Sequence, residues 1–331
     1  MLLTTYFNAS DFVYPLFIWH FIIGSIFLTW ISRATVGDLC SNLADNLRYT
    51  GPSIISSENA LTNVVQQVTD LISKKHTCQQ DFGDDEELQE VMGGTSEFDW
   101  IVIDRALDVV SGLAAALGPQ FPELWKIFEK SVLRFMSSSE NIERATGVGV
   151  LAEVIAGMKD SVTPLTGRFL PLLLKRLSDE DPQTKSNAAY ATGRLIEATS
   201  DDSIVSQFSV IMEKLEPCLQ QEVSRLPDNA TGCLSRMILK QHGKVPIADV
   251  LPAIVKILPL ENDYEENEPL YKMIAQLCTF LFTTMISRIE TNILQTNGRT
   301  PLFASLPPSS CPSSSLSSLT RTSSRMSDAR S

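Results

Sequence analysis

The segment 169–177, FLPLLLKRL, is an apolar run with helical spacing, and it stops at the polar turn SDEDP of residues 178–182. Asp is a favoured N-cap and Pro a favoured first helical residue, so Asp181 and Pro182 predict the start of a second helix. That second helix carries small and aliphatic residues at helical spacing over 187–196. The segment therefore predicts a pair of helices whose small residues allow close approach.

The same pattern recurs about every 40 residues, which is the period of HEAT or armadillo repeats. Helices rich in small residues are expected over 106–113, 144–151, 188–195 and 230–237, and helices with larger apolar faces lie between them. Each pair can bury its apolar face only against its neighbours, so such repeats stack into a curved solenoid. We therefore predict an all-α HEAT-repeat superhelical solenoid of about five helix pairs, with HEAT helices over 34–75 and 100–278.

An acidic segment interrupts the pattern between residues 76 and 99. It contains no Lys or Arg, and its carboxylates include Asp81, Asp84, Asp85, Glu86, Glu87 and Glu90. This composition predicts an acidic loop between two helices of one repeat. The loop is either a solvated insertion that aids solubility or an electrostatic attractor for a basic partner.

The two ends differ in composition from the middle. Residues 12–31 are apolar without formal charge and long enough to cross a bilayer, and they lack the basic start and cleavage site of a secretory signal. They are a candidate transmembrane helix, a buried helix, or foreign N-terminal sequence within 1–33. Residues 279–331 are divergent and Ser/Pro-rich, which predicts a mostly disordered tail.

The composition argues against several classes of function. The formal net charge of −12 disfavours nucleic acid and favours basic partners. Six widely spaced cysteines suit buried thiols in a reducing compartment. His76 and Cys78 could begin a metal site, but nothing at zinc spacing completes it. No set of catalytic groups converges, so we expect neither an enzyme nor a cofactor.

Several strings, at 78–87, 97–113, 124–130, 177–191 and 263–267, resemble the karyopherin-beta family of nuclear import receptors. The resemblance extends from about Ala34 to Cys278. It implies a receptor that moves between cytoplasm and nucleus and is found at the nuclear envelope. Such receptors carry basic cargo, such as histones and ribosomal proteins, past nuclear pore proteins under control of the GTPase Ran.

The resemblance also implies a groove for nuclear-localisation signals on the concave face, where the second helices lie. The cargo-binding roles are carried to Glu153, Tyr190, Asn229, Glu265 and Glu266. An Asn side chain can hydrogen-bond the N–H and C=O groups of an extended backbone, and carboxylates pair with Lys and Arg. Tyr190 could pack on a lysine stem or hold its cation.

The resemblance stops at both ends of this region, and receptors of the family are much longer. We therefore expect a truncated or imperfectly predicted gene product that lacks the Ran-binding repeats and whose isolated body is poorly soluble. Two other readings remain open. One is a membrane-tethered HEAT adaptor with a single span over residues 12–31, and the other is a generic cytosolic HEAT scaffold.

Overall fold

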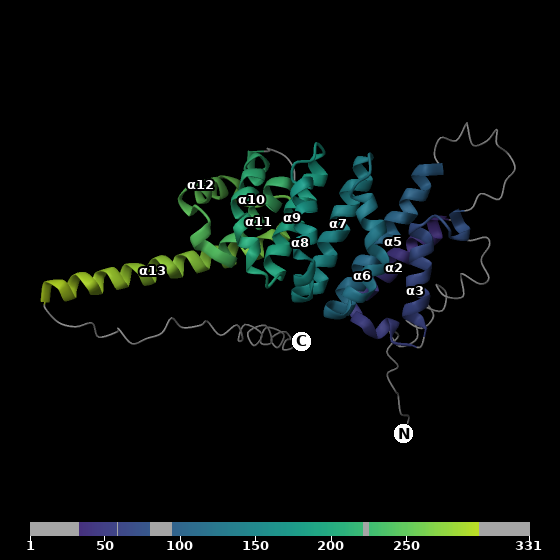
Figure 1. Ribbon diagram of the computed structural model, residues 1–331, viewed down its shortest axis with the longest axis horizontal. Helices are drawn as coiled ribbons and strands as arrows, with labels where there is room; N and C mark the ends of the chain where they lie inside the picture. Colours follow the sequence, from purple (N-terminus) through teal and green to yellow (C-terminus); the bar gives the residue numbers. More distant parts are fainter. Residues whose placement is uncertain (1–32, 58, 80–94, 221–224, 298–331) are drawn as a thin grey trace, which may run out of the picture. The chain divides into compact units, whose positions relative to one another are not determined.

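A computed structural model describes residues 33–57, 59–79, 95–220 and 225–297. Every regular element in these ranges is an α-helix or a short 3₁₀ segment, so the predicted all-α class is confirmed. The chain divides into two units, Met1–Ala275 and Gln276–Ser331. The first unit holds the helical repeats and is described first (Figure 1).

Helix α2 is followed by five consecutive helix pairs, each made of a first and a second helix. The first helices are α3 (Ala60–Ile72), α6 (Pro122–Phe135), α8 (Thr166–Arg176), α10 (Phe208–Leu215) and α12 (Ile247–Ile257). The second helices are α5 (Thr95–Leu117), α7 (Asn141–Met158), α9 (Pro182–Ala198), α11 (Arg225–Gln241) and α13 (Asn267–Asn297), and α2 (Arg33–Thr50) packs against α5 in the same layer.

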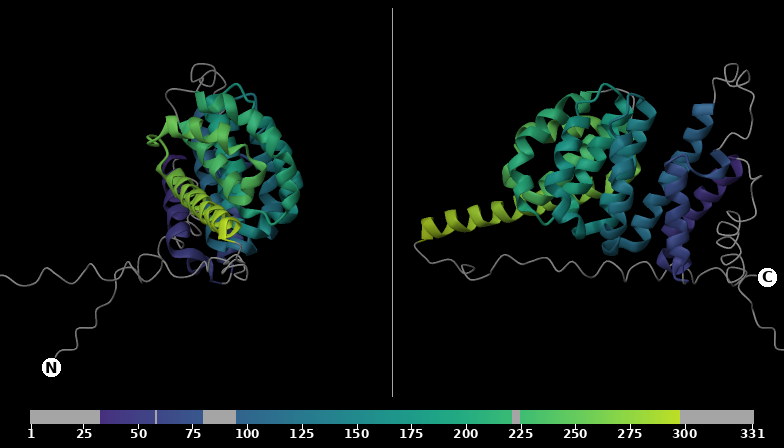
Figure 2. Two further views of the ribbon diagram at one scale, coloured as in Figure 1. Left: turned by 90° about the vertical axis from the view of Figure 1, so that its left-hand side faces the viewer. Right: turned by 45° about the vertical axis from the view of Figure 1, so that its right-hand side comes forward.

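The second helices pack against one another in chain order, α2 on α5, α5 on α7, α7 on α9 and α9 on α11 (Figures 1 and 2). Glycines allow this close approach. A Cβ on Gly157 of α7 would lie 2.6 Å from the carbonyl oxygen of Ala114 in α5. A Cβ on Gly193 of α9 would lie 3.1 Å from the Cα of Cys233 in α11. The small residues that the sequence places on these helices therefore set a backbone-to-backbone spacing.

Large side chains fill the space among the first helices. Trp125 of α6 and Phe169 of α8 are fully buried, and their rings meet edge to face at 5.8 Å. Such rings hold the first helices apart, while the second helices approach at backbone distance. This difference bends the array toward the second helices, and we call their exposed side the inner face.

The turn over residues 178–182 is built as the sequence predicts. Helix α9 begins at Pro182, and the Asp181 carboxylate accepts a hydrogen bond from the Thr184 backbone N–H at 2.7 Å. Asp179 accepts hydrogen bonds from Arg144 at 3.0 Å and from Arg176 at 2.7 Å. Burial alone would raise the pKa of Asp179, but these arginines outweigh it and lower the pKa to about 2.

Helix boundaries differ from the predicted domain limits at two places. Helix α5 begins at Thr95, inside the predicted acidic loop, and α13 continues to Asn297, past the predicted boundary at Cys278. The acidic residues Asp81–Glu90, the apolar run 12–31 and the tail from residue 298 lie outside the described residues.

Helix α13 crosses the boundary between the two units. In the second unit its exposed apolar side chains are Phe280, Leu281, Phe282, Met285, Ile286 and Ile289. Within the described ranges, Tyr264–Thr291 is the one helical stretch whose length and composition would allow it to cross a membrane. Its first part packs inside the first unit, where Leu270 and Met273 are fully buried.

Candidate functional site

A groove of about 460 Å³ runs along the inner face across four second helices. We call it the inner groove. Its lining residues come from α5, α7, α9, α11 and the segment before α13: Asp104, Arg105, Asp108, Ser111, Thr146, Gly149, Val150, Glu153, Asn187, Tyr190, Arg225, Asn229, Asp263 and Glu265. Glu153, Tyr190, Asn229 and Glu265, four of the five residues predicted to bind cargo, therefore lie together.

Polar side chains tie each second helix to the one before it. Thr146 Oγ1 donates to Asp104 Oδ1 at 3.2 Å, Asn187 Nδ2 donates to the Ala145 carbonyl at 2.8 Å, and Asn229 Nδ2 donates to Ser186 Oγ at 3.0 Å. These bonds join residues 42 or 43 positions apart, which is one repeat. Residues that line the inner groove are thus held in place by hydrogen bonds between equivalent positions of successive repeats.

Asn229 has one unused hydrogen-bonding group. Its side chain is only 4% exposed, and its Oδ1 is buried without a hydrogen-bond partner among the described residues. A buried acceptor without a partner costs about 1–3 kcal/mol. Because Asn229 lines the inner groove, a ligand with an N–H donor could supply the missing partner.

The inner groove is negatively charged. Its lining contains five carboxylates and two guanidinium groups. Asp108 pairs with Arg48 of α2, and Asp263 pairs with Arg225 at 3.0 Å. Across the described ranges, Glu153 and Glu265 have no ion pair within 4.0 Å. These two carboxylates are therefore available to an incoming cation.

The pKa of Glu153 is raised by its surroundings in the inner groove. Its side chain reaches solvent, but the surrounding groove walls partly desolvate it and raise its pKa, and the nearby charge of Glu265 raises the pKa further. Arg194, Arg48 and a hydrogen bond from the Tyr190 hydroxyl oppose the rise. A bound cation would relieve the repulsion between the two carboxylates.

Tyr190 is half-buried between two arginines. The guanidinium carbon of Arg194 lies 5.9 Å from the centre of its ring, and that of Arg236 lies 6.0 Å away. Burial raises the pKa of the Tyr190 phenol, and the negative charge of Glu153 adds to the effect. The ring already holds cations of the protein itself, so a cargo lysine would compete with them.

Glu266 requires a correction. The sequence pairs it with Glu265 as a cargo-binding residue, but Glu266 is fully buried and forms an ion pair with Arg236. Arg236 is only 3% exposed and also pairs with Glu197 at 3.0 Å. Glu266 faces inward because it follows Glu265 in the 3₁₀ turn Tyr264–Glu266, where adjacent residues point in different directions. It cannot reach a ligand in the inner groove.

The sequence analysis missed several lining residues, above all Asp104 and Asn187. Asn187 lies one repeat before Asn229 and Asp104 lies three repeats before it. Asn187 forms a hydrogen bond across the α7–α9 interface, and Asp104 forms one across the α5–α7 interface. The repeat spacing was the signal that could have identified them.

The groove offers carboxylates, amides and a phenol, which suit recognition of a basic peptide. In the ranges that the structure covers, no group of three or more His, Cys, Asp or Glu side chains could hold a metal ion. His76 Nδ1 and Cys78 Sγ lie 3.0 Å apart, but no third ligand joins them there.

Comparison with curated proteins gives three relatives, while no family model matches the chain. A probable importin subunit beta-4 of Schizosaccharomyces pombe is 37% identical over 217 residues, which is 63% of this chain and 20% of that protein. Importin-4 of Homo sapiens is 28% identical over 76% of this chain and 23% of that protein. Importin-4 of Mus musculus is 27% identical over 71% of this chain and 21% of that protein. The chain thus spans about a fifth of the length of these relatives.

Solved structures of the karyopherin Kap121p have the same fold. Kap121p bound to the SUMO protease Ulp1p has a TM-score of 0.59 at 13% identity, over 80% of this chain and 24% of that one. Kap121p bound to RanGTP has a TM-score of 0.60 at 14% identity, over 83% of this chain and 25% of that one. These matches confirm the HEAT-type solenoid, and the curated relatives lend no support to the membrane-tethered reading. Over most of its length, the chain is therefore similar to a part of the importin-beta-type transport receptors.

Proposed function

We propose that this chain is a cargo-binding part of a nuclear import receptor, and that its inner groove binds Lys/Arg-rich nuclear-localisation signals. Histones and ribosomal proteins are the cargo class that the acidic surface suits. The binding residues are Glu153, Tyr190, Asn229 and Glu265. Shuttling between cytoplasm and nucleus follows from this role.

The observation that carries the proposal is the combination of an unpaired acceptor with unpaired carboxylates in one groove. Asn229 Oδ1 lacks a partner, and an extended peptide can offer it a backbone N–H. Glu153 and Glu265 lie close enough for each charge to act on the other, and neither has an ion pair among the described residues. An extended peptide would donate a backbone N–H to Asn229 Oδ1, and a Lys or Arg side chain of the same peptide would pair with the carboxylates of Glu153 and Glu265.

The relatives support the wider role. The three curated proteins are importins by name, and one Kap121p structure holds RanGTP. By resemblance to the family, this chain would contact nuclear pore proteins, whereas its Ran-binding repeats are expected to be missing. The acidic loop at residues 81–90 would act as a further attractor for basic cargo.

Binding of a fluorescent lysine-rich histone-tail peptide to the full chain tests the proposal. We expect Glu153→Gln with Glu265→Gln to weaken binding about ten-fold or more, because hydrogen bonds to charged groups contribute about 1.5–3 kcal/mol. Asn229→Ala should weaken binding as well. Its thermal unfolding must be compared with that of the wild type, because the substitution also removes the bond to Ser186.

Two controls make the result specific. Glu180→Gln removes one exposed carboxylate from the turn before α9, outside the inner groove, and should leave binding unchanged. A peptide with its lysines replaced by glutamines should not bind. Equal affinity of the Glu153/Glu265 double variant and the wild type for the lysine-rich peptide would overturn the proposal.

A further inference from the structure

Helix α13 carries an apolar stripe where it runs through the second unit. The stripe consists of five large side chains with exposures between 41% and 66%: Leu281, Phe282, Met285, Ile286 and Ile289. Their spacing of one, three and four residues places them on one side of the helix, over an arc of roughly 140° at about 100° per residue. Adjacent large apolar side chains that are open to water commonly mark an interaction site.

Hydroxyl side chains make up most of the opposite side of this segment. They are Thr283, Thr284, Ser287 and Thr291. The three threonines each donate a hydrogen bond to the backbone carbonyl four residues earlier, at 3.0, 2.8 and 2.7 Å. A hydroxyl that is already hydrogen-bonded costs less to move out of water than a free one. This side of α13 therefore tolerates partly dehydrated surroundings.

Charge is sparse and balanced along the same segment. Between Gln276 and Thr291, the charged side chains are Arg288 and Glu290. By helical spacing they lie beside the apolar stripe, one at each edge, where a long charged side chain can reach water while the stripe is covered. With one charge of each sign, the segment has no electrostatic preference for an anionic or a cationic partner. A partner is therefore recognised through apolar contact.

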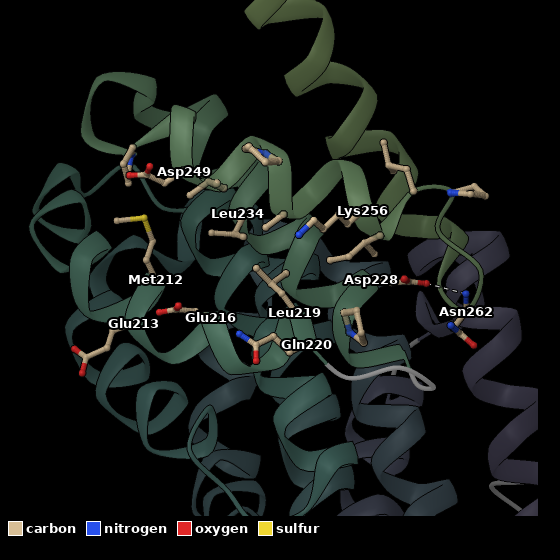
Figure 3. A pocket seen from close by; sticks show the side chains of 18 of the residues that line it. Met212, Glu213, Glu216, Leu219, Gln220, Asp228, Leu234, Asp249, Lys256 and Asn262 are labelled. Atoms are coloured by element: carbon tan, nitrogen blue, oxygen red, sulfur yellow. Dashed lines mark hydrogen bonds between the residues drawn. The ribbon is translucent and has the colours of Figure 1, made fainter.

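The start of α13 is held in the first unit, so only its later part is open to a partner. Buried Asp228 accepts hydrogen bonds from the backbone N–H groups of Asn262 and Asp263 at 2.7 and 2.8 Å, in the segment that leads into the helix (Figure 3). Leu270 and Met273 are then fully buried. In the second unit, the uncharged stretch 276–287 is shorter than the roughly 20 apolar residues that a membrane-spanning helix needs.

We propose that the apolar stripe of α13 binds the surface of a lipid bilayer, with the helix lying along the boundary between headgroups and acyl chains. The stripe enters the acyl region, and the hydroxyl side faces the headgroups. A broad apolar arc suits a continuous surface, whereas two helices that pair in a coiled coil share a narrower seam. Because no cationic cluster attracts anionic lipids, entry depends on gaps between headgroups, and binding is therefore sensitive to curvature. The proposal does not depend on the function of the inner groove.

Flotation of the full chain with phosphatidylcholine vesicles tests the proposal. We expect it to bind small sonicated vesicles about ten-fold more than large extruded vesicles of the same lipid. Phe282→Glu with Ile286→Glu should weaken binding to the small vesicles at least about ten-fold, because it places two charges in the stripe. Thr283→Glu with Ser287→Glu is the matched control, since it adds the same charge to the opposite side and should retain binding. All four side chains are exposed, so the far-ultraviolet circular dichroism should not change.

A photo-crosslinkable phosphatidylcholine locates the contact, because the apolar run 12–31 of the full chain could itself bind lipid. Lipid adducts, mapped by mass spectrometry, are expected within residues 281–289. Adducts confined to residues 12–31, or equal flotation of the two double variants, would overturn the proposal. Sedimentation without lipid tests a second copy of the chain as the occupant. A wild type that does not float, but forms a dimer that only the stripe variant dissociates, would show that the stripe joins two chains and that the proposal is wrong.

Discussion

Arg236 of α11 and Glu266 of the turn before α13 form an ion pair that is almost closed to solvent, with exposures of 3% and 0% for the two side chains. The carboxylate occupies the space beside Gly232, one turn before Arg236 on α11. A Cβ at Gly232 would lie 1.3 Å from Glu266 Oε2 and 2.3 Å from its Cδ. Glycine at this position therefore makes room for the pair.

Gly232→Ala should destabilise the chain by about 3–5 kcal/mol, because it expels one partner of a buried ion pair and leaves the other uncompensated. The free energy of unfolding in urea measures the effect. Gly167→Ala is the matched control, since a Cβ there meets nothing within 4 Å. It should change the stability little, because Gly167 lies in the first turn of α8, where the cost of glycine in a helix interior does not apply in full. Equal stabilities of the two variants would contradict this account of Gly232.

Asp179→Asn should cost about 2 kcal/mol, because the carboxylate accepts hydrogen bonds from both Arg144 and Arg176. The folded pKa of about 2 lies below the value of about 3.9 for an unfolded Asp. Asp179 therefore stabilises the fold fully above about pH 4, and this contribution is lost as the pH falls toward 2. Acid unfolding of the wild type and the variant should converge in that range. A constant difference in stability down to pH 2 would be inconsistent with this role.

Most of the fold could be predicted because each repeat has local sequence signals for its helices and for the turns between them. The turn at 178–182 contains the N-cap residue of the following helix, and the small residues of the second helices recur about every 40 residues. Glu266 could not be placed in the same way. Whether the first or second of two adjacent glutamates turns inward depends on Arg236, 30 residues earlier, and on the missing Cβ of Gly232. Such distant steric complementarity has no signature in a single segment.

Arg194→Gln should strengthen binding of the lysine-rich peptide to the inner groove by a few-fold. The Arg194 guanidinium lies against Tyr190, pairs with Glu197 at 3.0 Å, and lowers the pKa of Glu153 by its charge. Arg194 therefore competes with a cargo cation for the Tyr190 ring and for the negative charge of Glu153. Fluorescence anisotropy with the histone-tail peptide measures the change.

The control for Arg194 is Arg168→Gln, which removes the same charge from α8. Arg168 pairs with Glu129 at 2.9 Å and does not line the inner groove. Its substitution should change the affinity little. If both variants strengthen binding equally, net charge rather than local competition accounts for the effect.

Peptide binding to the inner groove should weaken on acidification at a pH above about 4.3, the value for an ordinary Glu. Burial raises the pKa of Glu153, the Glu265 charge raises it further, and Arg194 and Arg48 only partly compensate. Because the ionised carboxylate binds the cation, affinity falls as the pH drops through this raised pKa. Glu265→Gln removes the neighbouring negative charge, so the midpoint of the pH profile should shift to lower pH even though the affinity is weaker throughout.

The decisive comparison is between Glu265→Gln and Glu153→Gln, titrated with a peptide that contains no histidine. Glu153→Gln should remove the part of the pH dependence that arises from the raised pKa of Glu153, although Asp104, whose pKa burial also raises, still lines the groove. The histidines of the described residues, His76 and His242, do not line the groove. A midpoint that stays in place in both variants would mean that Glu153 does not contact the cation, and the binding surface would then have to lie elsewhere on the inner face.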